Sequence, residues 1–471
     1  MLTNDEVESV HHASLDILQN VGIHVTLKEA QDMFAKNGAI VDYEKNIAKF
    51  PPDVVMDYVR KAPTEFALYS RNSKFDMFLT PGNAYFGFGP GPTRFLDIDT
   101  GRAREATLND LDKLIRLADS LENFSFISEL VYPTDVPPAV TTQYIWASAF
   151  KNSSKHMQMY IEGADYVRDG IAMASAVSGS EEALAKKPII DFLGCVGQPL
   201  TYETKLITGF MEAAKHKIPV YVQSGAMAGA TGPATLAGTL ALCNAEILSG
   251  IVVLQMTNPG TPVVYMNWAR IFDMKSANVT FNSPEFVKLR IAVGQLVRRC
   301  YHIPFASPGF QVDSKMLDVQ AGYEKYVTLI SMLAGANVML GETVSGANHT
   351  DPLGWIIDDE LAANYKQIMK GFPVNNETLA LDVVRSVGTG PGRNFLGTKH
   401  THEHFRENQW LDYTISDRRS DTIWEKDGAK DAKQRARKKL EERLTHQPEQ
   451  LPNDVQKELD RIVSDARKRH A

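Results

Sequence analysis

From residue 84 onward, short apolar runs alternate with amphipathic stretches of helical length, and this alternation constrains the fold more than any other feature. Strands and helices that alternate in this way indicate βαβ units with parallel strands. Eight runs are present, which predicts an α/β fold of the (β/α)8 TIM-barrel type. The predicted strands are Tyr85–Phe88, Phe124–Val131, His156–Ile161, Ile189–Cys195, Val220–Gln223, Val263–Met266, Pro304–Ala306 and Asn337–Leu340.

An open, doubly wound sheet is the alternative to a closed barrel. Such a sheet typically binds a dinucleotide on a G-x-G-x-x-G turn after its first strand. The glycine-rich segment from Gly87 to Pro92 contains two prolines, which make it a poor phosphate cradle. The sequence therefore favours the barrel, which we assign to residues 84–375.

The chain before the barrel, residues 1–83, is predicted as an N-terminal helical subdomain. The residues Thr3–Glu6 can cap a helix, and Pro51-Pro52 suits the first turn of another.

The chain after the barrel, residues 376–471, is predicted as a C-terminal extension with a charged helical tail. Lys, Arg and Glu crowd residues 425–447 and 453–470. This pattern is typical of a solvated pair of helices with i,i+4 ion pairs, and a docking surface for a partner is the alternative.

Charge and cysteine content argue against several classes of protein. Fifty Lys and Arg stand against 57 Asp and Glu, so a nucleic-acid-binding or membrane-binding protein is not expected. The three cysteines (Cys195, Cys243 and Cys300) lie far apart, which predicts no disulfide framework and a reducing, cytoplasmic location. The acidic N-terminus does not resemble a signal peptide, and no apolar run is expected to reach membrane-spanning length.

The predicted carboxyl ends of the strands are rich in aromatic and amide side chains and poor in Lys, Arg and His. In a (β/α)8 barrel the chemistry takes place at these ends. Aromatic faces together with a few acids suit a cation that lacks N–H donors, such as a quaternary ammonium. The alternative is that these rings only pack beneath loops.

The long polar loop after the eighth predicted strand, residues 341–352, is the strongest candidate for a functional segment. It directly follows a buried strand, as binding loops often do. His349 is its candidate functional side chain.

Three histidines, His400, His402 and His404, lie within five residues. On an extended chain they would face one side and could bind zinc, but the segment lies outside the eight strands and has no further ligand at a familiar spacing. We therefore predict no metal site. The cysteines are interpreted as small buried apolar side chains rather than nucleophiles.

The chain resembles the trimethylamine methyltransferase superfamily, in its branch without pyrrolysine. The resemblance runs nearly end to end and rests on several segments together. These are Gly87–Gly91, Ser331–Asn337, Gly397–Thr401, His404–Arg406 and Ser416–Arg419, with Trp424 and Gly428. It implies a (β/α)8 barrel and transfer of a methyl group from an amine to the cobalt of a separate corrinoid protein.

Members with pyrrolysine carry it in the loop after the last strand, where this chain has standard residues from Glu342 to Asp351. Trimethylamine needs activation before its methyl group leaves, whereas a quaternary amine already leaves as a neutral tertiary amine. The resemblance therefore implies a quaternary amine as substrate. Glycine betaine and proline betaine are favoured, and carnitine and γ-butyrobetaine are the other candidates.

The resemblance also implies roles for side chains near the strand ends. Glu342 would balance the ammonium charge, and His349 is the second residue assigned to catalysis. The expected aromatic cage is Phe86, Phe88, Tyr160, Trp268 and Trp355. The expected donors to a substrate carboxylate are His349, Asn348, Gln223, Gln311 and Arg270.

No permanently bound cofactor is expected, because the corrinoid (cobalamin) comes with a partner protein that docks across the barrel mouth. A homo-oligomer is also expected. The alternatives are a barrel that only binds a quaternary amine or corrinoid, a barrel lyase or aldolase, and a zinc-assisted methyltransferase.

Overall fold

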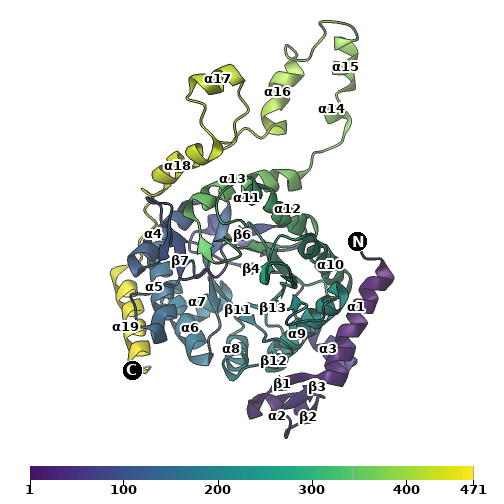
Figure 1. Cartoon of the computed structure of the whole chain (residues 1–471), viewed down its shortest axis with the longest axis vertical. Coiled ribbons are helices and arrows are strands. Elements are labelled where there is room, and N and C mark those ends of the chain that lie inside the picture. The colour runs from purple at the N-terminus through teal and green to yellow at the C-terminus, as the bar shows by residue number, and fades with distance from the viewer. Residues whose placement is uncertain (342, 470–471) are drawn as a thin grey trace.

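The computed structural model describes residues 1–341 and 343–469, which form a closed barrel of eight parallel strands ringed by helices (Figure 1). Around the barrel the strands are β6 (Tyr85–Gly87), β9 (Phe124–Ile127), β10 (His156–Tyr160), β11 (Ile190–Cys195), β13 (Val220–Ser224), β15 (Val263–Asn267), β18 (Phe305–Pro308) and β19 (Val338–Leu340). The first residue of each strand lies within two residues of the first residue predicted for it. The prediction of a (β/α)8 barrel is confirmed.

The outer layer is made of one main helix after each strand. These helices are α4 (Leu108–Ser120), α5 (Thr141–Asn152), α6 (Ala164–Ser178), α8 (Thr204–Lys215), α9 (Leu236–Thr257), α10 (Pro284–Cys300), α12 (Tyr326–Leu333) and α13 (Pro352–Lys370). Shorter elements between them are η3 (Pro138–Val140), α7 (Glu181–Lys186) and α11 (Val319–Glu324). Thr107 caps α4 and Ser283 caps α10 through side-chain hydrogen bonds, so local sequence fixes where these two helices begin.

Each barrel strand presents one face to the helices and the other to the interior of the barrel, as the two-residue period of a strand requires. In β10, Met157 and Met159 pack in the outer layer with the helices. Tyr160 joins the interior cluster, so Gln158 lies on the interior face as well.

The amino end of the barrel is closed by a hairpin of β4 (Phe66–Leu68) and β5 (Met77–Leu79). Leu68, Met77 and Leu79 belong to the interior cluster of the barrel. This hairpin does not cover the opposite, carboxyl end, which carries the loops after the strands and is called the open end below.

Two small sheets lie in the loops after the barrel strands. One contains β7 (Arg94–Leu96), β8 (Ala103–Glu105), β20 (Thr343–Val344) and β21 (His349–Thr350). The other contains β14 (Met227–Ala228), β16 (Arg270–Asp273) and β17 (Asn278–Thr280).

The N-terminal segment contains the expected helices and also strands that the sequence did not predict. In chain order it has α1 (Asn4–Asp16), η1 (Ile17–Val21), β1 (Ile23–Val25), α2 (Lys28–Lys36), β2 (Ile40–Asp42), β3 (Ile47–Lys49), α3 (Pro52–Val59) and η2 (Ser73–Phe75). The strands β1, β2 and β3 pair with β12 (Thr201–Tyr202), which comes from the barrel. A purely helical subdomain was wrong because strands of three residues leave too short a pattern to recognise.

One sequence expectation about membranes needs correction. The helix α9 is long and apolar enough to cross a membrane by length and composition. However, 83% of its apolar window is buried inside the protein, where it packs against α1, α3 and α8. Its apolar character is therefore that of a core helix.

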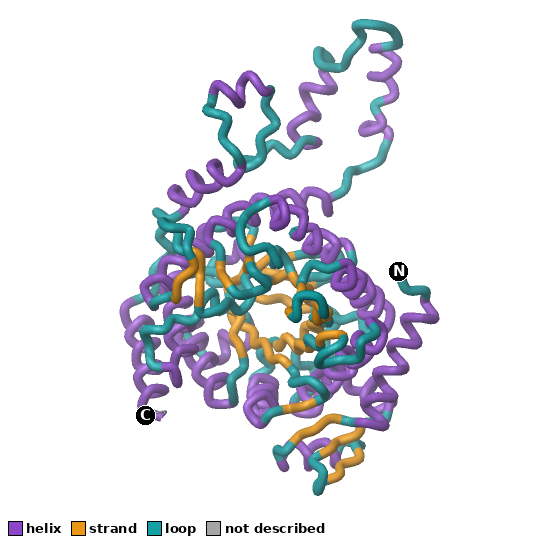
Figure 2. Tube along the Cα trace, viewed as in Figure 1, coloured by secondary structure: helices purple, strands orange, loops and turns teal. Residues whose placement is uncertain are grey.

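The segment from residue 371 to 413, which we call the arm, projects sideways from the barrel (Figure 2). It carries α14 (Asn376–Leu379), α15 (Leu381–Val387) and α16 (Lys399–Asn408). After it come α17 (Asp421–Lys426), α18 (Ala432–Arg443) and α19 (Asn453–Arg469). The predicted ion pairs are present in α19, and each of the last two helices also buries an apolar stripe, α18 against α13 and α19 against α5 and α6.

Candidate active site

Side chains from neighbouring strands meet at the open, carboxyl end of the barrel. Tyr160 ends β10, and Trp268 follows β15, and both rings pack on the interior cluster. Gln223 pairs in register with Cys195 near the ends of β13 and β11. These two share the interior face with Tyr221 and Leu193 by the alternation of a strand. The structure thus places Tyr160, Trp268 and Gln223 at this end of the barrel, and their role in binding stays a prediction.

Several polar atoms near this end are buried without a hydrogen-bond partner among the described residues. They are Nε1 of Trp268, Oε1 of Gln311 and Oγ of Ser128. A buried polar group that stays unpaired costs about 1–3 kcal/mol, so native proteins pair such groups with water or a ligand. The open end therefore offers hydrogen-bonding groups to water or to a polar ligand.

Arg270 supplies a positive charge at the same end. Its side chain is half-buried, and its Nε is buried without a partner in the described part of the chain. A Cβ built on Gly225, just after β13, would lie 2.9 Å from Nη1 of Arg270. The guanidinium also lies over Phe281, 5.3 Å from the ring centroid. Burial lowers the pKa of Arg270, but a guanidinium remains charged at neutral pH.

Cys195 is the thiol nearest to this group. Burial raises its pKa to about 11, and the charge of Arg270 opposes that rise. The side chain therefore remains a thiol at neutral pH, which makes it a poor nucleophile.

A second polar layer lies deeper in the barrel, about 13 Å of strand below Cys195 at roughly 3.3 Å per residue. Nδ1 of His156 lies 2.7 Å from the carbonyl oxygen of Tyr69, and its Nε2 lies 3.0 Å from Oδ2 of Asp191. Since the carbonyl only accepts, Nδ1 carries a proton, and the second proton is shared between Nε2 and Asp191. Burial raises the pKa of Asp191, and the His156 hydrogen bond opposes that rise.

This deeper layer also contains unpaired polar atoms. Oδ1 of Asp191 and Oη of Tyr221 are fully buried and have no hydrogen-bond partner within residues 1–341 and 343–469. The interior of the barrel therefore contains a polar layer, although the strands around it are mainly apolar.

Sequence reasoning missed Glu246, a buried carboxyl beneath the site. It accepts hydrogen bonds from the Ser224 hydroxyl, at the end of β13, and from the Leu200 backbone N–H at 2.8 Å. Burial raises the pKa of Glu246 to about 7, against the lowering effect of these hydrogen bonds. A single charged residue inside the long apolar helix α9 was the signal that could have found it.

Glu129, which follows β9, is a second buried carboxyl at this end. It accepts hydrogen bonds from Trp146 Nε1 at 2.9 Å, from the Tyr160 backbone N–H at 3.1 Å and from the Tyr132 hydroxyl. Burial raises its pKa, and these hydrogen bonds oppose the rise. Its contacts fix the backbone that carries Tyr160.

Three of the five predicted cage residues face the wrong way. Phe86, Phe88 and Trp355 are almost completely buried in the outer layer between strands and helices. The Phe88 ring centroid lies 4.7 Å from those of Phe124 and Trp355. For Phe86 and Phe88 the prediction was wrong by one residue, because the two-residue period of β6 places Tyr85 and Gly87 on the interior face instead. Trp355 lies on α13, outside the ring of strands.

The predicted loop after the eighth strand forms part of the small sheet with β7 and β8. Asn348 is exposed and donates from Nδ2 to the Ser345 carbonyl at 2.6 Å, and its role as a donor to a substrate carboxylate stays a prediction. His349 is half-buried in β21, where burial and then Arg94 lower its pKa. The role of His349 stays a prediction, and Glu342 lies outside the described residues.

The histidines near residue 400 lie on the arm, in a helix rather than an extended segment. His400 and His404 share one face of α16, with ring centroids 4.4 Å apart, and His402 does not lie on that face. No group of three metal-ligating side chains occurs among the described residues.

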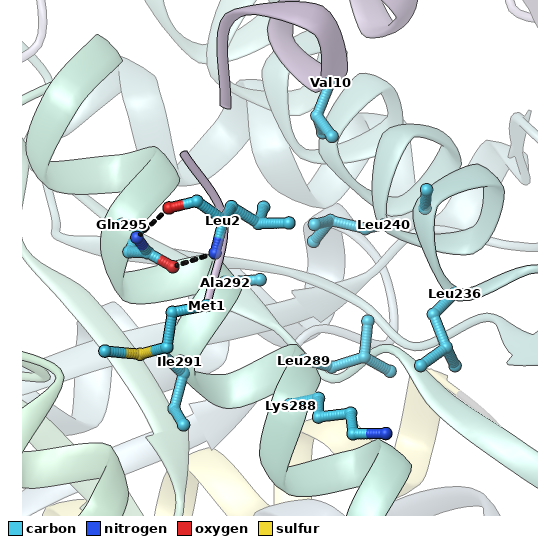
Figure 3. Close-up of a pocket in the computed structure, with 11 residues that line it drawn as sticks. Met1, Leu2, Val10, Leu236, Leu240, Lys288, Leu289, Ile291, Ala292 and Gln295 are labelled. Atoms are coloured by element: carbon cyan, nitrogen blue, oxygen red, sulfur yellow. Dashed lines mark hydrogen bonds between the residues drawn. The ribbon is translucent and has the colours of Figure 1, made fainter. Parts of the chain in front are cut away.

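An apolar pocket of about 310 Å³ lies on the outside of the barrel, between α1, α9 and α10 (Figure 3). Leu2 borders it and is held by two hydrogen bonds between its backbone and the Gln295 amide, of 2.8 and 3.1 Å. Leu236, Leu240 and Leu289 form much of its wall. It carries none of the polar groups of the open end, so we do not assign it to the active site.

Comparisons with known proteins agree on one family. A family model described as trimethylamine methyltransferase (MTTB) matches residues 1–471. Trimethylamine methyltransferase MttB of Desulfitobacterium hafniense (strain DSM 10664 / DCB-2) is 33% identical over 98% of this chain and 93% of its own. A glycine betaine methyltransferase of D. hafniense (strain Y51) is 32% identical over 98% and 96%, respectively. Identity alone therefore does not separate the two substrates.

Among solved structures, the hydroxylamine complex of MtmB is similar in fold. It covers 100% of this chain and 87% of its own, with a TM-score of 0.53 and 11% sequence identity. This likeness supports the barrel architecture.

Proposed function

Because this chain belongs to the trimethylamine methyltransferase (MTTB) family and is thus a methyltransferase for methylated amines, we propose that it demethylates a quaternary amine. The methyl acceptor is the cobalt of a corrinoid carried by a separate protein. The favoured substrates are glycine betaine and proline betaine, with carnitine and γ-butyrobetaine as alternatives.

The observation that carries this proposal is the meeting of aromatic rings and one guanidinium at the open end. Tyr160 and Trp268 offer faces that attract a methylated ammonium, each contact contributing about 0.5–2 kcal/mol. Arg270 offers a half-buried cation for a carboxylate, as a betaine carries. An amine without a carboxylate, such as trimethylamine, leaves that cation unused.

The reaction requires little acid–base chemistry from this chain. Cobalt(I), when the corrinoid is docked at the open end, supplies the nucleophile. The leaving group is a neutral tertiary amine, so no side chain has to donate a proton. The chain's own task is to exclude water and to align the N–CH3 bond.

The residues present fit a corrinoid brought by a partner. The Cys195 thiol, with its pKa raised to about 11, does not compete for the methyl group. The described carboxyl ends of the barrel strands carry no lysine, so a Schiff-base aldolase has no nucleophile there.

A spectroscopic assay with reduced cobalamin tests the proposal. The purified chain is mixed with cobalt(I) cobalamin, or with its cognate corrinoid protein, and a panel of methylated amines, and methylcobalamin is followed by absorbance. We expect turnover with one betaine and the release of its tertiary amine. Turnover with trimethylamine and with no betaine contradicts the proposal, as does binding of a betaine without turnover in the presence of the cognate corrinoid protein.

A further inference from the structure

We propose that the arm is an interaction surface for a second copy of this chain. The arm of each copy lies across the helices α11 and α12 of the other, so that two arms are exchanged in a two-fold symmetric dimer. This inference concerns assembly and does not depend on the substrate.

The arm has no core of its own. None of the residues in α14, α15 and α16 is buried. Large apolar side chains are nevertheless frequent in it, and three of them are more than two-thirds exposed, Phe372 (81%), Val374 (71%) and Leu396 (84%). Others at the surface are Leu379, Leu381, Val384, Phe395 and Leu411. So many exposed large apolar side chains within one segment indicate an interaction site.

The helices of the arm are too short to be stable without a partner. They contain 4, 7 and 10 residues, respectively. Isolated helices below about 12–15 residues are marginal in water, and ordering each residue costs about 1–2 kcal/mol. Burial against another surface is what would offset that cost.

Both ends of the arm are fixed to the barrel. The arm begins where α13 ends at Lys370, and Glu360 of the same helix holds the chain where the arm ends. The Glu360 carboxylate accepts hydrogen bonds from the backbone N–H groups of Ile415 and Ser416, the latter at 2.7 Å, and from both hydroxyls beside them. The arm is thus a projecting segment whose two ends are both held at α13, which we call its base.

The same chain carries an unpaired apolar stripe next to that base. Met316 precedes α11, Val319 and Tyr323 lie on α11, and Tyr326 and Leu333 lie on α12. A spacing of four residues places Val319 and Tyr323 on one side of α11, and a spacing of seven places Tyr326 and Leu333 on one side of α12. All five are exposed, from 40% for Tyr326 to 86% for Val319.

Position and charge favour a second copy as the occupant. The arm and the stripe lie on the same side of the barrel, and the arm extends sideways from the ring of strands rather than across its open end (Figure 1). A corrinoid protein at that end would leave both surfaces uncovered. The arm carries four basic and five acidic residues, so it offers little net charge to a charged partner. One two-fold axis pairs each arm with the other stripe, as in isologous dimers.

The mass of the full-length chain in solution tests this proposal. We expect about twice the chain mass of 52.3 kDa by light scattering after size-exclusion chromatography. Replacing residues 373–411 with about eight Gly and Ser residues can bridge the roughly 15 Å between Glu360 and Lys370 of α13, and should give the monomer mass. A monomeric full-length chain, or an arm-deleted chain that remains dimeric, overturns the proposal.

Point variants separate loss of the contact from loss of the fold. Leu396→Asp in the arm and Val319→Asp with Tyr323→Asp in the stripe should each give monomers with an unchanged circular dichroism spectrum. Ile40→Asp, at a similarly exposed apolar residue on β2, is the matched control and should leave the dimer intact.

Mixing two monomeric variants distinguishes arm exchange from any other dimer. An arm-deleted chain still has a normal stripe, and a stripe variant still has a normal arm. The mixture should therefore recover a heterodimer through one intact arm–stripe contact, although neither variant dimerises alone. Failure of the mixture to associate, even at a chain concentration tenfold above that at which the full-length protein dimerises, overturns the exchange.

Discussion

The barrel and the arm bury apolar side chains in different places. In the barrel, Phe88 is fully buried between Phe124 and Trp355. In the arm, Phe395 is 44% exposed and lies in a segment whose helices bury nothing. The same type of residue therefore stabilises the fold in one region and remains available for association in the other.

This difference separates what the chain does alone from what it does with others. The barrel holds the candidate site in a complete core, so the site should form in a single copy. The arm completes its packing only in an assembly. Changes in the two regions should therefore alter different measurements.

The largest expected effect comes from truncating the same residue type in both regions. Phe88→Ala removes a ring from the closely packed outer layer and should lower the free energy of unfolding by about 3–5 kcal/mol. Phe395→Ala, made in the monomeric Leu396→Asp variant and compared with that variant, should lower it by less than about 0.5 kcal/mol, because no partner copy then covers the ring. Urea-induced unfolding of both variants at equal chain concentration makes the measurement. Equal losses would mean that the arm is part of the barrel's folding unit.

Arg270→Gln tests whether the barrel end binds the carboxylate of a betaine. Loss of a charge-assisted pair with a carboxylate costs about 1.5–3 kcal/mol, so betaine affinity should fall about 10- to 100-fold in titration calorimetry. Tetramethylammonium, which has no carboxylate, should bind as before.

Two controls accompany this variant. Arg270→Lys should recover part of the betaine affinity, because it keeps the charge without the planar fork. Leu396→Asp in the arm should leave the affinity unchanged. If tetramethylammonium loses affinity as much as betaine does, Arg270 has a structural role instead.

The barrel could be predicted from the sequence because each of its strands leaves a local apolar run between helix signals. All eight runs became strands, and local caps such as Thr107 and Ser283 begin helices between them. The arm left no such pattern, since its apolar residues have no partner within the chain. Its short helices follow from local caps such as Asn375 and Thr398, not from a periodic buried face.

The candidate site could be predicted only in part, for a physical reason. Tyr160, Trp268, Gln223 and Arg270 follow or end strands whose register the sequence located within one residue. Phe86 and Phe88 came from a correctly placed strand, but a strand alternates faces at every residue, and apolar runs buried on both faces do not reveal which face is interior. The deeper groups, Asp191 and His156, lie inside apolar runs and meet only through strand pairing.

The pH dependence of the free energy of unfolding should differ between a buried carboxyl of the barrel, Glu246, and an exposed carboxyl of the arm. Its folded pKa of about 7 exceeds the usual 4.5, so the folded state keeps a proton that the unfolded state releases. This group therefore lowers stability progressively as pH rises from about 4.5 to 7. Relative to Glu246→Gln, which cannot titrate, the native chain should lose about 1–3 kcal/mol over that range. Glu377→Gln, which removes an exposed carboxyl on the arm, should show no such dependence of stability on pH. If the stability difference between the native chain and Glu246→Gln does not change with pH, Glu246 does not keep its proton in the folded state.

The smallest expected effect comes from replacing two tryptophans, one on the interior face of the barrel and one between the strands and the outer helices. Trp268 packs on the interior cluster, whereas Trp355 is 1% exposed in the outer layer. Trp268→Leu should weaken binding of a quaternary amine by about 0.5–2 kcal/mol, or roughly 2- to 30-fold, because it removes one aromatic face. Trp355→Leu should reduce thermal stability and leave the dissociation constant of the folded protein unchanged. Calorimetric titration and thermal unfolding of both variants provide the four values. If Trp355→Leu weakens binding and Trp268→Leu does not, the aromatic cage lies between the strands and the outer helices. The proposed site inside the barrel is then wrong.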